Sequence, residues 1–133
     1  MELAKDGIKP LSEDRPKAIS EDREQMLFIQ WFRRNHPNTL IFHIPNGGYR
    51  RPSEAARLKA MGVVPGIPDL FIPEWRLFIE MKRTKGGKLS DVQKSVIEYL
   101  QSVNYCVLLA HGTDEAIKQV KENYERYICN NQD

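Results

Sequence analysis

The sequence has 133 residues, of which 41% are hydrophobic and 29% are charged, and its formal net charge at pH 7 is +2. This composition is typical of a globular protein and excludes a fibrous or intrinsically disordered chain. The longest apolar runs, such as LFI and VLLA, are far shorter than the roughly 20 residues that cross a bilayer, and the N-terminus has no apolar signal-peptide centre. We therefore expect no membrane contact and one domain that works in the cytoplasm.

Residues 1–19 mix proline, lysine and acidic residues without periodicity, so we expect a loose N-terminal arm. Apolar residues at helical spacing then predict a helix over residues 20–35, which must end before Pro37. The remaining predicted elements, in chain order, are a strand over 39–44, a glycine-rich loop over 45–52, a helix over 53–62, strands over 69–73 and 76–82, a helix over 89–102, a strand over 105–110 and a helix over 113–128. The predicted N-caps of the four helices are Ser20, Ser53, Ser90 and Thr113. This order, α-β-α-β-β-α-β-α, predicts an α/β fold with a mixed β-sheet flanked by helices.

Two acidic residues stand at unusual places on the predicted central strands. Asp69 opens the first of them and Glu80 follows Leu77-Phe78-Ile79 in the second. Neighbouring strands lie only about 4.8 Å apart, so the two carboxylates can share one site. Alternation along the strand puts Glu80 and Lys82 on the same face, with Met81 opposite.

Such a cluster suits the hydrolysis of phosphodiester bonds. Two close carboxylates repel each other unless a cation neutralises them, and a hard divalent ion prefers oxygen ligands. The ammonium group of Lys82 can orient the nucleophile or neutralise developing charge. The alternative is a turn residue beside a solvent-exposed pair of opposite charges, and this would be the better interpretation if the three residues stood without context.

The context favours a site for a polyanion. Residues 33–94 contain 12 lysine and arginine residues against 5 aspartate and glutamate residues, so the middle of the chain is basic. Pro68-Asp69 opens one strand, Glu80-Met81-Lys82 closes the next, and the segment KRTKGGK follows.

The segment PD followed by EMK resembles the signature of the PD-(D/E)XK nuclease superfamily. The flanking segments HIPNGGYR, RLKAMGVVPGIPDLFIP, LFIEMKRTKGGKLSDVQ and DEAIKQV resemble the VRR-NUC (virus-type replication-repair nuclease) family over residues 20–120. The resemblance implies a restriction-endonuclease-like fold, a single nuclease domain over residues 20–133, and Mg²⁺- or Mn²⁺-dependent endonuclease action on DNA.

The resemblance also implies roles for individual residues. Asp69 and Glu80 become metal ligands, Lys82 the catalytic lysine and Gln93 a glutamine that supports the site, while Met81 is assigned to the metal site with the two acids. The family further places an acid on the first helix. Glu21 and Glu24 both remain candidates there, as does Gln25, and we prefer Glu21 because it lies closest to the apolar direction of that helix.

The predicted DNA contacts are Asn46, Arg50 and Arg51 in the glycine-rich loop, and Arg83, Lys85 and Lys88 after the second central strand. Such groups position a phosphate backbone without reading its sequence. Stand-alone relatives are associated with homodimers and junction resolution, which implies a homodimer that cuts Holliday junctions or other branched DNA. The alternatives are a DNA-binding module that does not cut and a monomeric flap or nicking nuclease.

Overall fold

The computed structural model describes residues 20–45 and 51–129. The predicted N-terminal arm, residues 1–19, lies outside this part, as do Asn46 and Arg50. The described helices are α1 (Glu21–Asn35), α2 (Pro52–Ala60), α3 (Asp91–Ser102) and α4 (Thr113–Cys129), and the strands are β1 (Phe42–His43), β2 (Leu70–Ile72), β3 (Leu77–Lys82) and β4 (Cys106–His111). A short 3-10 helix, η2 (Pro73–Trp75), joins β2 to β3. The predicted order of helices and strands is confirmed.

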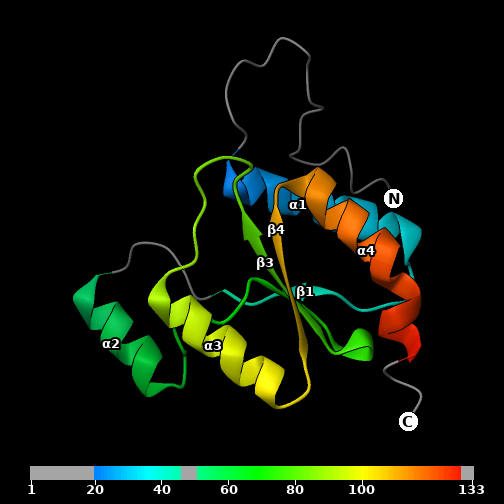
Figure 1. The fold of residues 1–133 in the computed structure, drawn as a ribbon. Helices are drawn as coiled ribbons and strands as arrows, with labels where there is room; N and C mark the ends of the chain where they lie inside the picture. Colours follow the sequence, from blue (N-terminus) through cyan, green and yellow to red (C-terminus); the bar gives the residue numbers. More distant parts are fainter. Residues whose placement is uncertain (1–19, 46–50, 130–133) are drawn as a thin grey trace.

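The four strands form one mixed sheet in the order β1-β2-β3-β4. The pairs β1·β2 and β2·β3 are antiparallel, whereas β3 and β4 are parallel. Helices α1 and α4 pack together over one face of the sheet, and α3 lies on the other side of β4 (Figure 1). The expected α/β architecture, a mixed sheet flanked by helices, is therefore confirmed.

Strand β3 lies at the centre of the sheet, and all six of its residues are buried. The side chains of Leu77, Ile79 and Met81 join the main hydrophobic core, where they meet Phe28 and Phe32 of α1. Alternation sends the other three residues of β3, which include Glu80 and Lys82, to the opposite face. The strand thus buries one apolar row in the core and holds one acid and one lysine on the reverse side.

The helix boundaries agree with the predicted caps at two helices and differ at the other two. Ser20 accepts a hydrogen bond from the Arg23 N–H, and Ser90 forms a capping box with Gln93. Ser53 is not an N-cap, because α2 begins at Pro52, whose fixed φ suits the first helical position. Thr113 is also not the N-cap, because it is already the first residue of α4.

Strand β1 is much shorter than the predicted strand over residues 39–44. Only Phe42 and His43 pair with β2, which itself has three residues, and Leu40 is 62% exposed. Pro73 directly follows β2 and cannot donate to a sheet ladder, so the partner strand cannot extend further. The apolar composition of residues 39–44 instead reflects the burial of Ile41 in the core. Within the described part of the chain, no helix combines the length and the apolar character that a bilayer crossing requires.

Candidate active site

Three carboxylates from three elements converge at one end of the sheet. Glu21 comes from the first turn of α1, Asp69 directly precedes β2, and Glu80 lies on β3. Each offers one oxygen atom, and these atoms lie within 4.8 Å of one another. The structure thus brings the two predicted strand acids together and adds Glu21 from the first helix.

Main-chain hydrogen bonds fix Asp69 at the entrance of β2. Its Oδ2 accepts a hydrogen bond of 2.8 Å from the Met81 N–H on the neighbouring strand. Its carbonyl oxygen accepts a second bond, of 2.7 Å, from the Ile44 N–H. The carboxylate is therefore held against β3, beside Glu80, by the backbone of the sheet itself.

Glu80, Lys82 and Gln93 form a closed hydrogen-bonded group. The Lys82 Nζ lies 3.3 Å from Glu80 Oε2 and donates to Gln93 Oε1 at 3.2 Å. The Gln93 Nε2 donates to Glu80 Oε2 at 3.1 Å, and the Ser90 N–H donates to Gln93 Oε1 at 2.9 Å. Gln93, which completes the capping box of α3, therefore also holds the side chains of Glu80 and Lys82 on β3.

The environment disfavours negative charge on all three acids. Burial and, after it, the nearby Asp69 carboxylate raise the pKa of Glu80 to about 7, against the opposing effect of Lys82. Burial likewise raises the pKa values of Asp69 and Glu21. A cation bound among the three carboxylates would reverse this cost, because it favours their ionised forms.

The donor set fits a hard divalent cation. Oxygen atoms of carboxylates are the ligands that Mg²⁺ and Mn²⁺ prefer, and no sulfur or imidazole group belongs to the cluster of Glu21, Asp69 and Glu80. The hydrogen bonds to Asp69 and Glu80 from outside the cluster are the kind that orient metal ligands.

Glu24, the other first-helix candidate, does not lie in this cluster. Its Oε2 accepts a hydrogen bond of 2.7 Å from the Thr84 hydroxyl, and its Oε1 accepts one of 2.8 Å from the Thr113 hydroxyl. Gln25 is also directed elsewhere, since its Nε2 lies 3.1 Å from His43 Nδ1. Of the three alternatives on α1, only Glu21 shares a site with Asp69 and Glu80.

Comparison with known proteins identifies the family. The model of the VRR-NUC domain family matches residues 19–114. The chain belongs to the VRR-NUC family. A solved structure described as a VRR_NUC domain protein is similar to this chain, with 30% sequence identity and a TM-score of 0.68, over 82% of this chain and 91% of that one. The comparison with curated proteins gives no match. Membership implies a nuclease-type function in DNA processing.

The remaining predicted site residues of this VRR-NUC domain lie around the cluster or outside the described part. The Met81 side chain is fully buried in the core, so only its main chain faces Asp69. Arg83, Lys85 and Lys88 are exposed after β3, and Arg51 is exposed at the start of α2. Asn46 and Arg50 fall among the residues that the structure does not describe.

Two residues behind the site, Thr84 and Thr113, are not among the predicted site residues. Gln93 was expected to support the site, and its spacing from Ser90 is the S-x-x-Q pattern of a capping box. No local pattern indicates the roles of Thr84 and Thr113, because they meet Glu24 across 60 and 89 residues of sequence.

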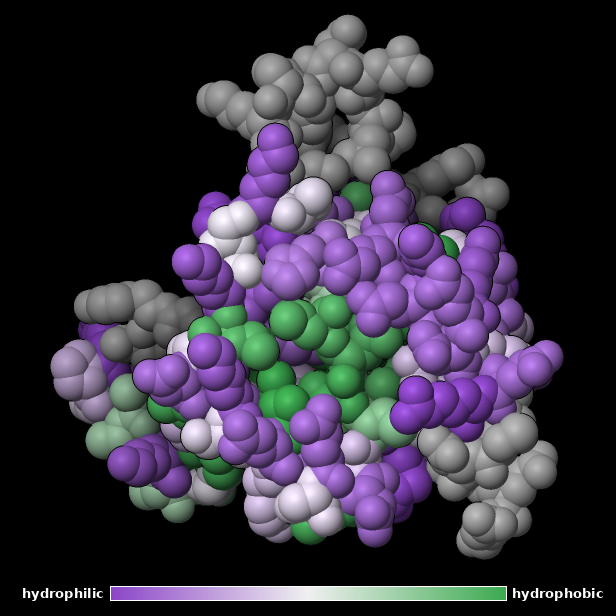
Figure 2. Space-filling model, in the orientation of Figure 1, coloured by the Kyte–Doolittle hydropathy of each residue, from purple (hydrophilic) through white to green (hydrophobic). Residues whose placement is uncertain are grey.

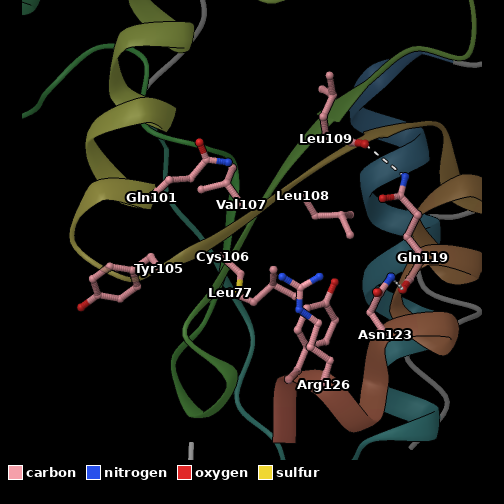
Figure 3. A pocket seen from close by; sticks show the side chains of 11 residues that line it. Leu77, Gln101, Tyr105, Cys106, Val107, Leu108, Leu109, Gln119, Asn123 and Arg126 are labelled. Atoms are coloured by element: carbon pink, nitrogen blue, oxygen red, sulfur yellow. Dashed lines mark hydrogen bonds between the residues drawn. The ribbon is translucent and has the colours of Figure 1, made fainter. Parts of the chain in front are cut away.

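A separate cavity in the described part of the chain lies away from this site. It has a volume of about 460 Å³ and follows the open edge of β4 between α3 and α4, where Figure 2 shows an apolar hollow. The lining residues are Leu77, Gln101, Tyr105, Cys106, Val107, Leu108, Leu109, Gln119, Asn123, Arg126 and Tyr127 (Figure 3). None of them is an acid, and Gln119 already donates to the Leu109 carbonyl oxygen at 3.2 Å. The cavity lacks the groups that phosphodiester hydrolysis needs.

Proposed function

We propose that this VRR-NUC domain is a Mg²⁺- or Mn²⁺-dependent endodeoxyribonuclease that works at the cluster of Glu21, Asp69 and Glu80. One observation carries the proposal: three carboxylates converge within 4.8 Å, beside a lysine that is only 8% exposed. An uncompensated cluster of this kind is unfavourable, so its presence favours a bound cation.

Each residue has a distinct role in this proposal. The carboxylates of Glu21, Asp69 and Glu80 hold the ion, and Met81 contributes its main-chain carbonyl, since its side chain lies in the core. Bound there, the ion supplies Lewis acidity, which activates water and stabilises charge on the phosphate. The Lys82 Nζ, aimed by Glu80 and Gln93, orients the nucleophile and neutralises developing charge.

The proposed substrate is branched DNA, with the Holliday junction as the first candidate. Four exposed basic side chains support contacts to a phosphate backbone. They are Arg51, which precedes Asp69 in the chain, and Arg83, Lys85 and Lys88, which follow Glu80. Asn46 and Arg50, which lie outside the described residues, are proposed as further phosphate contacts on the sequence pattern alone. Contacts of this type read the path of the backbone rather than the bases.

The proposed active form is a homodimer. No residue of α2 is buried, and the helix stands apart from α1 and α4 (Figure 1). Met61, Val63 and Val64, which directly follow it, expose apolar side chains. A second copy of the chain would cover this surface, and a C2 dimer would present two identical sites to a symmetric junction. Paired incisions require two such sites.

A panel of labelled DNA substrates tests the proposal. Four-way junctions, flaps, nicked duplexes and linear duplexes are incubated with and without Mn²⁺, and Glu80→Ala serves as the control for contaminating nucleases. We expect Mn²⁺-dependent paired cuts on the junction and none with the variant. DNA binding without cleavage in any metal would instead indicate a DNA-binding module, and single cuts confined to flaps by a monomer would overturn the substrate and the assembly.

A further inference from the structure

Glu24 is a buried acid that lies next to the site but not in it. It is only 4% exposed and follows Glu21 by three residues on α1, so both point to the same side of the helix. Its carboxylate accepts hydrogen bonds from the Thr84 hydroxyl at 2.7 Å, the Thr113 hydroxyl at 2.8 Å and the Thr113 N–H at 3.2 Å. Charge this deeply buried requires such compensation.

One partner of Glu24 follows the proposed catalytic lysine, and the other follows the neighbouring strand β4. Thr84 lies two residues after Lys82, and the Lys82 carbonyl oxygen accepts a hydrogen bond of 2.9 Å from the Gly112 N–H. Gly112 in turn precedes Thr113. The bonds therefore close a ring that runs from Glu24 to Thr84, back to Lys82, across to Gly112 and Thr113, and back to Glu24.

The ring is closely packed at Gly112. Gly112 has φ +96, a conformation that favours glycine. A Cβ atom at this position would lie 2.7 Å from Glu24 Oε2 and 2.7 Å from the Thr84 hydroxyl oxygen. The Glu24 carboxylate and the Thr84 hydroxyl therefore approach the backbone at Gly112 so closely that a side chain there would collide with them.

A simple helix cap accounts for only half of these contacts. The Thr113 N–H belongs to the first turn of α4, where N–H groups lack partners within the helix and a negative charge is favourable. This explains the bonds between Glu24 and Thr113. It does not explain why the second carboxylate oxygen binds Thr84, on the segment that continues the strand of Glu80 and Lys82.

We infer that Glu24 is a positioning residue that fixes α1, and with it Glu21, against the end of β3 that carries Lys82. The inference rests on the proposed metal-dependent function and extends it. Glu24 does not touch the reacting atoms. It sets the distance between Glu21 on the helix and the site residues on the sheet. Its two carboxylate oxygens are bonded to Thr84, which follows Lys82, and to Thr113, which follows Gly112.

Calorimetric titration of the full chain with Mn²⁺ alone, in the absence of DNA, tests this role, with cleavage rates and melting temperatures measured in parallel. Glu24→Ala is expected to weaken Mn²⁺ binding by about 10- to 100-fold, as loss of a group behind a metal ligand does. Thr84→Val, which removes one bond from an exposed residue, should weaken it by about three- to tenfold. Glu125→Ala, which removes an exposed acid near the far end of α4, is the control that should bind as the wild type does.

Glu24→Gln separates positioning from metal ligation. A glutamine keeps an oxygen acceptor for Thr113 and turns its NH₂ group toward the Thr84 hydroxyl, which can accept. We expect Mn²⁺ affinity within about threefold of the wild type, whereas Glu21→Gln should lose Mn²⁺ binding and cleavage.

Two results would overturn the inference while leaving the proposed function intact. One is Glu24→Gln losing Mn²⁺ binding as Glu21→Gln does, which would make Glu24 a ligand. The other is that Thr84→Val and Glu24→Ala both keep the wild-type Mn²⁺ affinity and cleavage rate and only melt at a lower temperature. If Glu24→Ala does not fold, the result for Thr84→Val decides alone. A wild-type chain that neither binds Mn²⁺ nor cuts DNA would instead refute the proposed function itself.

Discussion

The Gln93 Nε2 lies 3.1 Å from Glu80 Oε2, so the glutamine that completes the capping box of helix α3 is bonded to the acid of the central strand. We expect Gln93→Ala to lower the cleavage rate by about 10- to 100-fold, because Glu80 loses a donor and Lys82 an acceptor. Single-turnover kinetics at saturating Mn²⁺ measure the change. The neighbouring, exposed Lys94→Ala is the control, and an unchanged rate in Gln93→Ala would show that the link has no part in catalysis.

Lys82 should act on rate rather than on folding. We expect Lys82→Ala to lose about 10²- to 10⁴-fold in cleavage rate, because it removes an interaction made mainly with the transition state. Lys82 also lowers the pKa of Glu80. The comparison is therefore made at about pH 8.5, above the wild-type pKa of about 7, which favours the ionised form of Glu80 and should retain Mn²⁺ binding. A loss confined to DNA affinity would make Lys82 an ordinary phosphate contact.

The raised pKa of Glu80 predicts the pH dependence of stability. Glu80 has a pKa of about 7 in the folded chain and an ordinary value of 4.5. Between these values the folded chain keeps a proton that the unfolded chain has released, so the metal-free protein should lose stability as the pH rises from about 4.5 to about 7. Melting temperatures in a chelator, across this range, measure the effect. Glu80→Gln should flatten the profile, and an unchanged slope in that variant would assign the effect to other groups.

Gly112→Ala compares directly with Gly62→Ala. Both glycines have positive φ, of +96 and +105, but an added Cβ meets nothing within 4 Å at Gly62 and meets Glu24 and Thr84 at 2.7 Å at Gly112. Strained backbone alone costs about 1–2 kcal/mol, so Gly62→Ala should lose that much stability. Gly112→Ala should lose about 1–3 kcal/mol of stability in addition to that amount, because the added Cβ is also overpacked. Chemical denaturation measures both, and equal losses would mean that the segment around Glu24 yields freely.

The fold and the strand acids could be predicted because local pattern encodes them. Apolar runs bounded by proline and glycine mark the strands, and alternation along β3 assigns Glu80 and Lys82 to one face. The choice between Glu21 and Glu24 could not be settled in the same way. Both acids stand in the first turns of α1, and what separates them is the pair of threonines that engage Glu24 from 60 and 89 residues away.

The number of residues in β1 that pair with β2 was the other feature that could not be predicted from the sequence. Residues 39–44 have a strand-like composition, yet only Phe42 and His43 form the ladder, because β2 offers three residues as a partner. Pairing depends on both strands, whereas composition describes one. The burial of Ile41 without a strand partner illustrates the difference.

Cleavage and binding of a four-way junction by Asp69→Asn, measured side by side in Mn²⁺, test the central claim most directly. Asparagine keeps an oxygen for the Met81 N–H, so the fold should be retained while one charged ligand is lost. We predict that cleavage falls to background and that the dissociation constant for the junction stays within about threefold of the wild type, since the basic side chains supply the affinity. Cleavage by Asp69→Asn at the wild-type rate would contradict the assignment of the acid cluster as the catalytic metal site.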